Sequence, residues 1–558
     1  PALTRYRILF APLAGYAYMT LAGWYFLVSG FPGTDNYWRL LCLPPLAFLG
    51  LGFYRTRRDT PFAPLFNKDV AIASASGLLG FAIAAFPSIA FRKGLTAITL
   101  GNADVAYYSM MARYVKGSVH DPRSYLLANP QISSTALDRF GTVLTTAFPS
   151  SALSLETFEV QNIAMHVFFA VTILMVYVAA REVFGFSRSR AAMGAGLTAV
   201  NPLFHYVVWH NFEGQIIGSA LGLALIVLHT QAASAGTVST FARYFPMTVL
   251  LTWGLSASYG HMVPILLAAI GVYVLHLSWN QRSPELLGRW IAFCVATLAA
   301  TIVCSPERAQ LAFGQLTFFG GGIGALTRAP QGWFVPWLLP AGLFLQPNAF
   351  PWNDVRVPGF VQAILSIASV VLISVGLVRS RSRHPALYVV GSSWLAVIVA
   401  GTTLLGYVDR TGAGWGGYAS FKFLTFFLPL VLFVMLAWLA EPVRLSRSVL
   451  AVCSACLALV SCVGSYYLIR ETRVMLGVSG VTPEMAGLRS VEDDPRVHSI
   501  NISAGEYVGT MWKANFVARK ALFFEQGTYY PASTLRGDWT LTNVEKSVPG
   551  QVLNISVF

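Results

Sequence analysis

The stretch Gly101-Asn102-Ala103-Asp104-Val105-Ala106-Tyr107-Tyr108 lies in a polar loop of an otherwise strongly apolar chain. It lies in a segment, residues 92–158, that separates two apolar runs. Loops of that length without evident structure are usually functional. The carboxylate of Asp104 is therefore the first candidate for chemistry.

The composition around this stretch is that of a membrane protein. Hydrophobic residues make up 55% of the 558 residues, charged residues 11%, and the mean hydropathy is +0.59. We therefore expect an all-α polytopic membrane protein. Windows of roughly 17 to 25 apolar residues give about thirteen spans. They are residues 7–29, 38–54, 70–91, 159–180, 191–208, 214–232, 242–256, 259–279, 289–305, 359–378, 386–405, 419–439 and 448–469.

The formal net charge of +14 indicates membrane topology and not nucleic-acid binding, because the basic residues gather in short loops between spans. By the positive-inside rule those loops are cytoplasmic. An odd number of spans then places the N-terminus in the cytoplasm and the tail after residue 470 outside. The loop residues are Arg55, Arg57, Arg58, Arg181, Arg188, Arg190, Arg282, Arg289, Arg379, Arg381, Arg383, Arg444 and Arg447.

The six cysteines all lie in or at the ends of expected spans, so neither a disulfide framework nor a zinc site is predicted. Cys453 and Cys456 form a C-x-x-C pattern inside an apolar span, which favours helix packing over redox chemistry. We expect the first span to be a retained helix.

This topology divides the chain into five parts. An N-terminal hairpin of spans (1–69) precedes a seven-span module (70–305), which contains the long first extracytoplasmic loop (92–158). A second large loop (306–358), later spans (359–469) and an exported tail (470–558) follow.

Each large exported segment has its own pattern. Residues 103–116 and 134–146 are amphipathic and predict two interfacial helices. The second loop is rich in glycine and aromatic residues, which favours a re-entrant or interfacial segment. The tail alternates as a strand over 497–502 and predicts a small α+β or β domain of roughly 85 residues.

Seven spans bracketed by two long loops resemble the conserved module of GT-C superfamily glycosyltransferases. Gly101-Asn102-Ala103-Asp104 is similar to that family's acidic first-loop motif. Asn201-Pro202-Leu203-Phe204, followed by Asn211-Phe212-Glu213-Gly214-Gln215, resembles a stretch of bacterial members. The resemblance covers most of the chain. It implies transfer of a sugar from a polyprenyl-phosphate carrier at the extracytoplasmic face.

The chemistry of such a transferase needs a carboxylate base for the acceptor hydroxyl and cations for the leaving phosphate. Asp104 is the expected base, and the alternative is a helix-capping role. Asp138 competes with it, but its neighbour Arg139 and an expected mid-helix position favour a solvated ion pair. Many members have paired carboxylates where this chain has Asp104 alone. A divalent cation is therefore an open alternative, and no other cofactor is expected.

Lys422 is the expected phosphate-binding cation, because an intramembrane lysine is a functional candidate by default. Tyr418 lies four residues earlier and shares a helix face with it. Snorkelling of Lys422 to the interface is the alternative. Arg410, Arg308 and Arg328 would complete the anion clamp or contact lipid headgroups.

Two polar clusters at the outer ends of spans are expected to face the same cavity as Asp104. They supply the candidate substrate ligands His210, Asn211, Glu213, Tyr259 and His261. Glu213 would be a sugar ligand or second carboxylate, or would satisfy a helix end. The histidines would bind metal or, more in keeping with their scatter, make packing hydrogen bonds.

The sequence thus predicts a bacterial inner-membrane glycosyltransferase of inverting type. Its partners would be a polyprenyl-phosphate-sugar donor, the bilayer, and an envelope glycan, lipid or protein acceptor. A lipid-linked glycan flippase or secondary transporter, an O-antigen ligase or polymerase-type enzyme, and a non-catalytic envelope scaffold are the alternatives. Transporters favour inverted repeats and mid-membrane charges, whereas these candidates cluster at one face.

Overall fold

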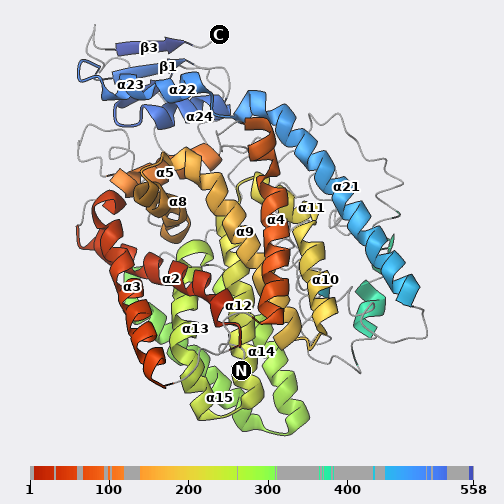
Figure 1. Cartoon of the computed structure of the whole chain (residues 1–558). Coiled ribbons are helices and arrows are strands. Elements are labelled where there is room, and N and C mark those ends of the chain that lie inside the picture. The colour runs from red at the N-terminus through yellow and green to blue at the C-terminus, as the bar shows by residue number, and fades with distance from the viewer. Residues whose placement is uncertain are drawn as a thin grey trace, which may run out of the picture.

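The computed structural model describes residues 5–30, 33–59, 67–92, 99–100, 104–117, 139–260, 262–307, 310, 364, 367–368, 370–371, 373–378, 381, 432–433, 447–497, 499–503, 507–524 and 552–556. Most of the described chain is a helical bundle, with a smaller lobe at one end (Figure 1). Predictions made for Lys422, Tyr418, Arg410, Arg308, Arg328, His261 and Asp138 lie outside these residues, as does most of the second large loop.

The bundle begins with three long helices. They are α2 (Arg7–Val28), α3 (Gly33–Asp59) and α4 (Lys68–Arg92). Two shorter helices of the first loop follow, α5 (Asp104–Gly117) and α8 (Phe140–Leu153). The remaining bundle helices are α9 (Thr157–Glu182), α10 (Arg188–Ala199), α11 (Pro202–Trp209), α12 (Glu213–Ala235), α13 (Val238–Tyr259), α14 (Met262–Gln281) and α15 (Pro284–Cys304).

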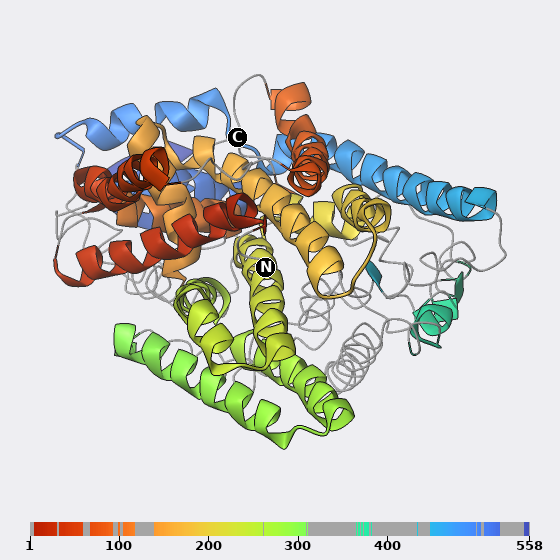
Figure 2. The same ribbon diagram turned by 60° about the horizontal axis from the view of Figure 1, so that its bottom comes forward.

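Helix α12 is the centre of the bundle. It packs against α9, α13 and α14, and its side chains are almost all buried. The green pair α14 and α15 forms one outer edge (Figure 2). Among the described helices, five are long and apolar enough to cross a membrane, namely α4, α9, α12, α14 and α15. The chain is therefore a multi-pass helical membrane protein, and about thirteen spans stays a prediction.

The expected single span over 191–208 is instead two helices, α10 and α11. The first ends at Ala199, and Asn201 caps the second, since its side chain accepts hydrogen bonds from the N–H groups of Leu203 (2.9 Å) and Phe204 (3.3 Å). Pro202 follows at the first helical position, where its missing N–H costs nothing. The apolar character of residues 191–208 alone does not predict this break.

The second interfacial helix also differs from its prediction. It begins at Phe140, with Arg139 as the residue before it, and not at residue 134. Arg139, which lies inside the predicted stretch, therefore precedes this helix. The first interfacial helix, predicted over 103–116, agrees with α5.

The C-terminal lobe, defined here as Pro483–Phe524 together with Val552–Ser556, follows the long helix α21 (Arg447–Ser479). It contains α22 (Pro483–Gly487), α23 (Arg489–Asp493), β1 (Ser499–Ser503), α24 (Tyr507–Phe516), β2 (Ala521–Phe524) and β3 (Val552–Ser556). The strands form a parallel sheet in the order β2-β1-β3, with Ser499 opposite Ala521 and Val552. Helix α21 continues through residue 470, where the exported tail was predicted to begin.

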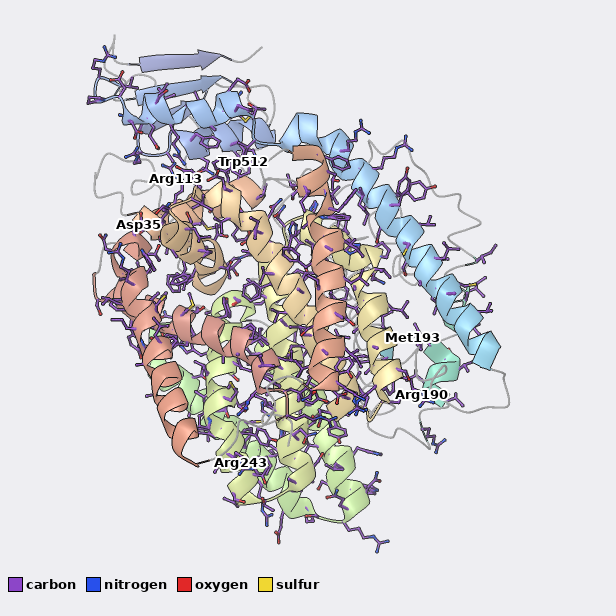
Figure 3. All side chains as sticks on the ribbon, viewed as in Figure 1. Asp35, Arg113, Arg190, Met193, Arg243 and Trp512 are labelled. Carbon is purple, nitrogen blue, oxygen red and sulfur yellow. The ribbon has the colours of Figure 1, made fainter. Side chains whose placement is uncertain are left out.

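The two ends of the bundle differ in their charges. The lobe and α5 lie at one end, with Arg113 and Trp512 next to each other, whereas Arg190 and Arg243 lie towards the other (Figure 3). At that basic end Asp69 is buried among arginines. It accepts hydrogen bonds from Tyr177 (2.8 Å), Arg181 (3.2 Å) and Arg188 (3.2 Å), and also from Arg5.

Candidate active site

The two polar sequence motifs meet at the lobe end of the bundle. The backbone N–H of Leu100 donates a hydrogen bond of 2.9 Å to the carbonyl of Trp209. Leu100 lies four residues before Asp104, and Trp209 lies four residues before Glu213. One backbone hydrogen bond therefore places Leu100, the residue before the first-loop motif, beside the turn that carries His210, Asn211 and Glu213.

That turn is held by local backbone chemistry. Asn211 has φ of +56°, a left-handed conformation that asparagine tolerates better than most residues. It lets the chain leave α11 and begin α12 at Glu213 within three residues. Trp209 anchors the turn, because its indole N–H donates to the carbonyl of Ala84 at 2.9 Å.

Glu213 is buried, with an exposed fraction of 1%. Its carboxylate accepts a hydrogen bond from the side-chain amide of Gln161 in α9. It lies in the first turn of α12, where a carboxylate interacts favourably with the helix dipole. This position agrees with the alternative role of Glu213 at a helix end. A buried carboxylate with an amide partner is equally able to bind a sugar hydroxyl.

Glycine at 214 brings the end of α13 close to Glu213. A β-carbon on Gly214 would lie 2.9 Å from the carbonyl oxygen of Ser258 and 3.2 Å from the ring of Tyr259. Only glycine allows this approach without a shift of the backbone. Tyr259, a predicted substrate ligand, is thus placed next to Glu213.

Tyr108 and Arg139 connect this cluster to α5. The guanidinium of Arg139 donates to the hydroxyl of Tyr108 and lies 5.8 Å from the centre of its ring. Both side chains lie near the hydroxyl of Tyr259. Tyr108 is four residues after Asp104, so the two positions share one face of α5. Tyr108 therefore turns its side of α5 towards Arg139.

Asp104 is the first residue of α5. This position agrees with both interpretations of the sequence, a base at the interface and a carboxylate at a helix N-terminus. His210 stacks on Tyr206, with ring centres 5.0 Å apart, and meets the edge of Phe212 at 4.5 Å. Both are packing contacts between aromatic rings.

No group of three or more His, Cys, Asp and Glu side chains comes together in the part of the chain that the structure describes. Near the α11–α12 turn the described donor set includes one carboxylate, that of Glu213. A hard divalent cation prefers several oxygen ligands of this type. These residues do not fit such an ion, and no catalytic step is assigned to one.

Three residues of this cluster were not among the sequence candidates. Tyr108 could have been found from its spacing of four from Asp104. Gln161 is an amide at the start of an apolar run, which is itself a signal in a membrane helix. Nothing in the sequence indicated that Arg139 contacts Tyr108, since that depends on where α8 begins.

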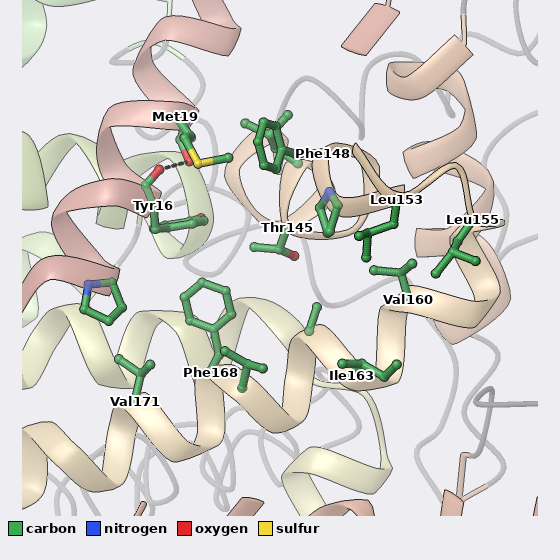
Figure 4. Close-up of a pocket in the computed structure, with 16 residues that line it drawn as sticks. Tyr16, Met19, Thr145, Phe148, Leu153, Leu155, Val160, Ile163, Phe168 and Val171 are labelled. Carbon is green, nitrogen blue, oxygen red and sulfur yellow. Dashed lines mark hydrogen bonds between the residues drawn. The ribbon is translucent and has the colours of Figure 1, made fainter. Parts of the chain in front are cut away.

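An apolar cavity of about 360 Å³ lies beside the cluster, between α2, α8 and α9 (Figure 4). Its apolar lining includes Leu144, Phe148, Val160, Ile163, Phe168 and Val171. The lining hydroxyls of Thr20 and Thr145 donate to the carbonyls of Tyr16 and Thr142 within their own helices. The cavity wall therefore offers little to a polar ligand and suits an aliphatic chain.

The cavity and the cluster share a wall. Tyr16 lines the cavity, and its hydroxyl is hydrogen-bonded to the hydroxyl of Ser258. The carbonyl of Ser258 in turn accepts from Thr142 (3.4 Å) and lies against Gly214. An aliphatic chain in the cavity would thus end close to the polar cluster.

The structure is similar to solved structures of an archaeal oligosaccharyltransferase from Archaeoglobus fulgidus. For its complex with an inhibitory peptide and a dolichol-phosphate, the TM-score is 0.47 at 14% identity, covering 81% of this chain and 64% of that one. For the apo form the TM-score is 0.45 at 13% identity, with the same coverage. For the complex with zinc and sulfate it is 0.44 at 14% identity, covering 81% and 62%.

This chain thus spans less than two thirds of the length of those structures. No family model matches the sequence, and no curated protein is similar to it.

Proposed function

We propose that the chain is an integral membrane glycosyltransferase of the GT-C type. It moves a sugar from a polyprenyl-phosphate donor to an envelope glycan, lipid or protein acceptor at the extracytoplasmic face. The bond between Leu100 and Trp209 carries this proposal, because its two residues lie four positions before Asp104 and four positions before the buried Glu213.

Asp104 acts as the general base in this proposal. It accepts the proton of the acceptor hydroxyl while that oxygen attacks the anomeric carbon, and the bond from that carbon to the carrier phosphate breaks with both electrons going to the phosphate. A single displacement of this kind inverts the anomeric configuration. Lys422 and Tyr418, with Arg410, Arg308 and Arg328, are proposed to stabilise the leaving phosphate.

The substrate ligands are proposed to be Glu213, Asn211 and Tyr259, with His210 and His261 beside them. The apolar cavity between α2, α8 and α9 would receive part of the prenyl chain, which is consistent with a lipid-linked donor. In this orientation the end with α5 and the lobe is extracytoplasmic, and the end with Asp69 and its arginines is cytoplasmic. The bacterial inner membrane is the proposed location.

Reconstituted liposomes test the reaction class. The donor probe is the pool of polyprenyl-phosphate sugars extracted from cells that carry the protein, labelled in the sugar. A transferase in the presence of envelope acceptor extract converts the label from a lipid-soluble to an acceptor-bound form. Movement of intact labelled lipid between leaflets, with its sugar–phosphate bond unbroken, would identify a transporter instead.

A further inference from the structure

The C-terminal lobe packs on the face of α5 that is opposite to Asp104. Successive residues of a helix turn by about 100°, so Tyr108 lies about 40° around the axis from Asp104. Ser109 and Arg113 lie about 140° and about 180° around it. Both of these residues contact the lobe, whereas Tyr108 contacts the bundle through Arg139. Helix α5 is thus held between the two.

The contacts between α5 and the lobe are polar and specific. The guanidinium of Arg113 donates to the carboxylate of Glu492 at 2.8 Å and to the backbone carbonyl of Asn515. The amide of Asn515 donates to the hydroxyl of Ser109 at 2.9 Å, and Ser109 shares a hydrogen bond of 2.7 Å with Thr157 of α9. One lobe side chain therefore joins α5 to the start of α9.

A second arginine closes the network. Arg489 donates to the carboxylates of Glu492 (2.9 Å) and Glu156 (2.7 Å), and Glu156 is the residue before α9. Beside these bonds the ring of Phe158 meets Phe516 at 5.2 Å and Trp512 at 6.4 Å. The lobe and the first-loop helices share one hydrophobic core. The lobe is therefore part of the packing around α5.

The charges at this contact are buried. The side chain of Glu492 is 0% exposed and that of Arg113 is 11% exposed. Burial, and then the charge of Arg489, lower the pKa of Arg113 to about 10, so it remains a cation at neutral pH. Burial raises the pKa of Glu492, but the charges of Arg113 and Arg489 outweigh it and hold that pKa below its usual value. Loss of Glu492 removes the carboxylate that pairs with the buried Arg113, whereas loss of Arg113 still leaves Glu492 paired with Arg489 (2.9 Å) and Arg519 (3.1 Å).

We propose that Glu492 and Arg113 are a positioning pair, through which the lobe fixes the orientation of α5 and so of Asp104. The inference rests on the proposed function, since it assigns the base to Asp104. Arg113 lies nine residues from Asp104, about 14 Å along the helix axis, so it touches no reacting group. A rotation of α5 carries Asp104 out of line with the acceptor, and small misplacements of this kind cost about 100-fold in rate.

The test compares Glu492→Gln with the control Asp494→Asn in the full chain. Asp494 lies two residues away in the same lobe and pairs with the exposed Arg496 (2.7 Å, 87% exposed). Two quantities are measured, amide exchange over residues 105–117 and transfer of sugar from extracted polyprenyl-phosphate sugars. In Glu492→Gln we expect faster exchange in α5, a fall in kcat of about 10- to 100-fold, and an unchanged KM for the donor. Asp494→Asn should match the wild type in both.

Arg113→Lys supplies the second variant, because it keeps the charge and loses the fork that binds Glu492 and Asn515 together. It should give the same two effects, faster exchange in α5 and a lower kcat, to a smaller extent. It therefore keeps the test available if Glu492→Gln does not fold. The proposal is overturned if exchange in α5 rises while kcat stays at the wild-type value, or if KM alone changes. A failure of the proposed function gives a different result. Asp104→Asn would then keep full transfer activity, whatever the rate of amide exchange in α5.

Discussion

The backbone N–H of Leu100 is hydrogen-bonded to the carbonyl of Trp209 at 2.9 Å, which joins two segments more than a hundred residues apart in sequence. Through this bond the position of the first-loop motif depends on the turn between α11 and α12. The indole of Trp209 fixes that turn by donating to Ala84. The geometry of the candidate site should therefore be sensitive to Trp209.

We expect Trp209→Phe to lower both stability and transfer. The variant keeps an aromatic ring but loses the hydrogen bond to Ala84, at a cost of about 1 to 3 kcal/mol for a buried group left unpaired. Unfolding in detergent measures the first effect and sugar transfer the second. Trp279→Phe is the control, because Trp279 is 82% exposed on α14. Equal behaviour of the two variants would contradict the role given to the turn.

Glu213→Gln separates a substrate ligand from a helix-end residue. Glutamine keeps the shape and can still accept a hydrogen bond from Gln161, so the fold should survive. If the carboxylate binds a sugar hydroxyl, transfer should fall by about 10- to 100-fold, the value of a charged hydrogen bond. Glu285→Gln, at an exposed pair with Arg289, should leave transfer unchanged. Full activity of Glu213→Gln would leave only the helix-end role.

Acid should release the lobe from α5. The pKa of Glu492 in the fold lies below its ordinary value of 4.5, so its contribution is complete above pH 4.5 and is lost as the pH falls through the lower, folded pKa. The fluorescence of Trp512, which is fully buried, should report this release. In Glu492→Gln the same transition should be absent. A transition that persists in that variant would have another cause.

At the opposite end, Asp69→Asn should destabilise the bundle strongly. The carboxylate holds Arg5, Arg181 and Arg188 together, and removing its charge leaves three cations facing one another. Breaking a buried ion cluster in this way costs about 3 to 5 kcal/mol, and less here because Arg188 is half exposed. Thermal unfolding in detergent measures the loss. An unchanged midpoint would show that the cluster contributes nothing measurable.

Helices with a regular pattern of apolar residues were predictable from the sequence. The apolar runs of α9 and α12 and the amphipathic stretch of α5 each specify a helix by themselves. The break at Asn201 and Pro202 was not predictable from hydropathy, because the residues there form a helix cap within a continuous apolar stretch. The strand at 499–503 was expected, but its parallel pairing with β3 depends on residues fifty positions away.

The sequence indicated which residues are candidates for the site, but not how they are arranged in space. Asp104 and Glu213 stand out as carboxylates at the borders of apolar runs. The bond at Leu100 that joins their two segments is made by backbone groups, which leave no mark in the residue types. The pairing of Arg113 with Glu492 spans 379 positions, so spacing could not indicate it.

The most direct test of the account is the pool of lipid-linked sugars in cells that carry Asp104→Asn, compared with cells that carry Asp138→Asn. The account predicts that Asp104→Asn accumulates the polyprenyl-phosphate sugar and leaves an envelope acceptor under-glycosylated, while Asp138→Asn matches the wild type. Normal glycans and a normal donor pool in Asp104→Asn, or the defect in Asp138→Asn instead, would contradict it.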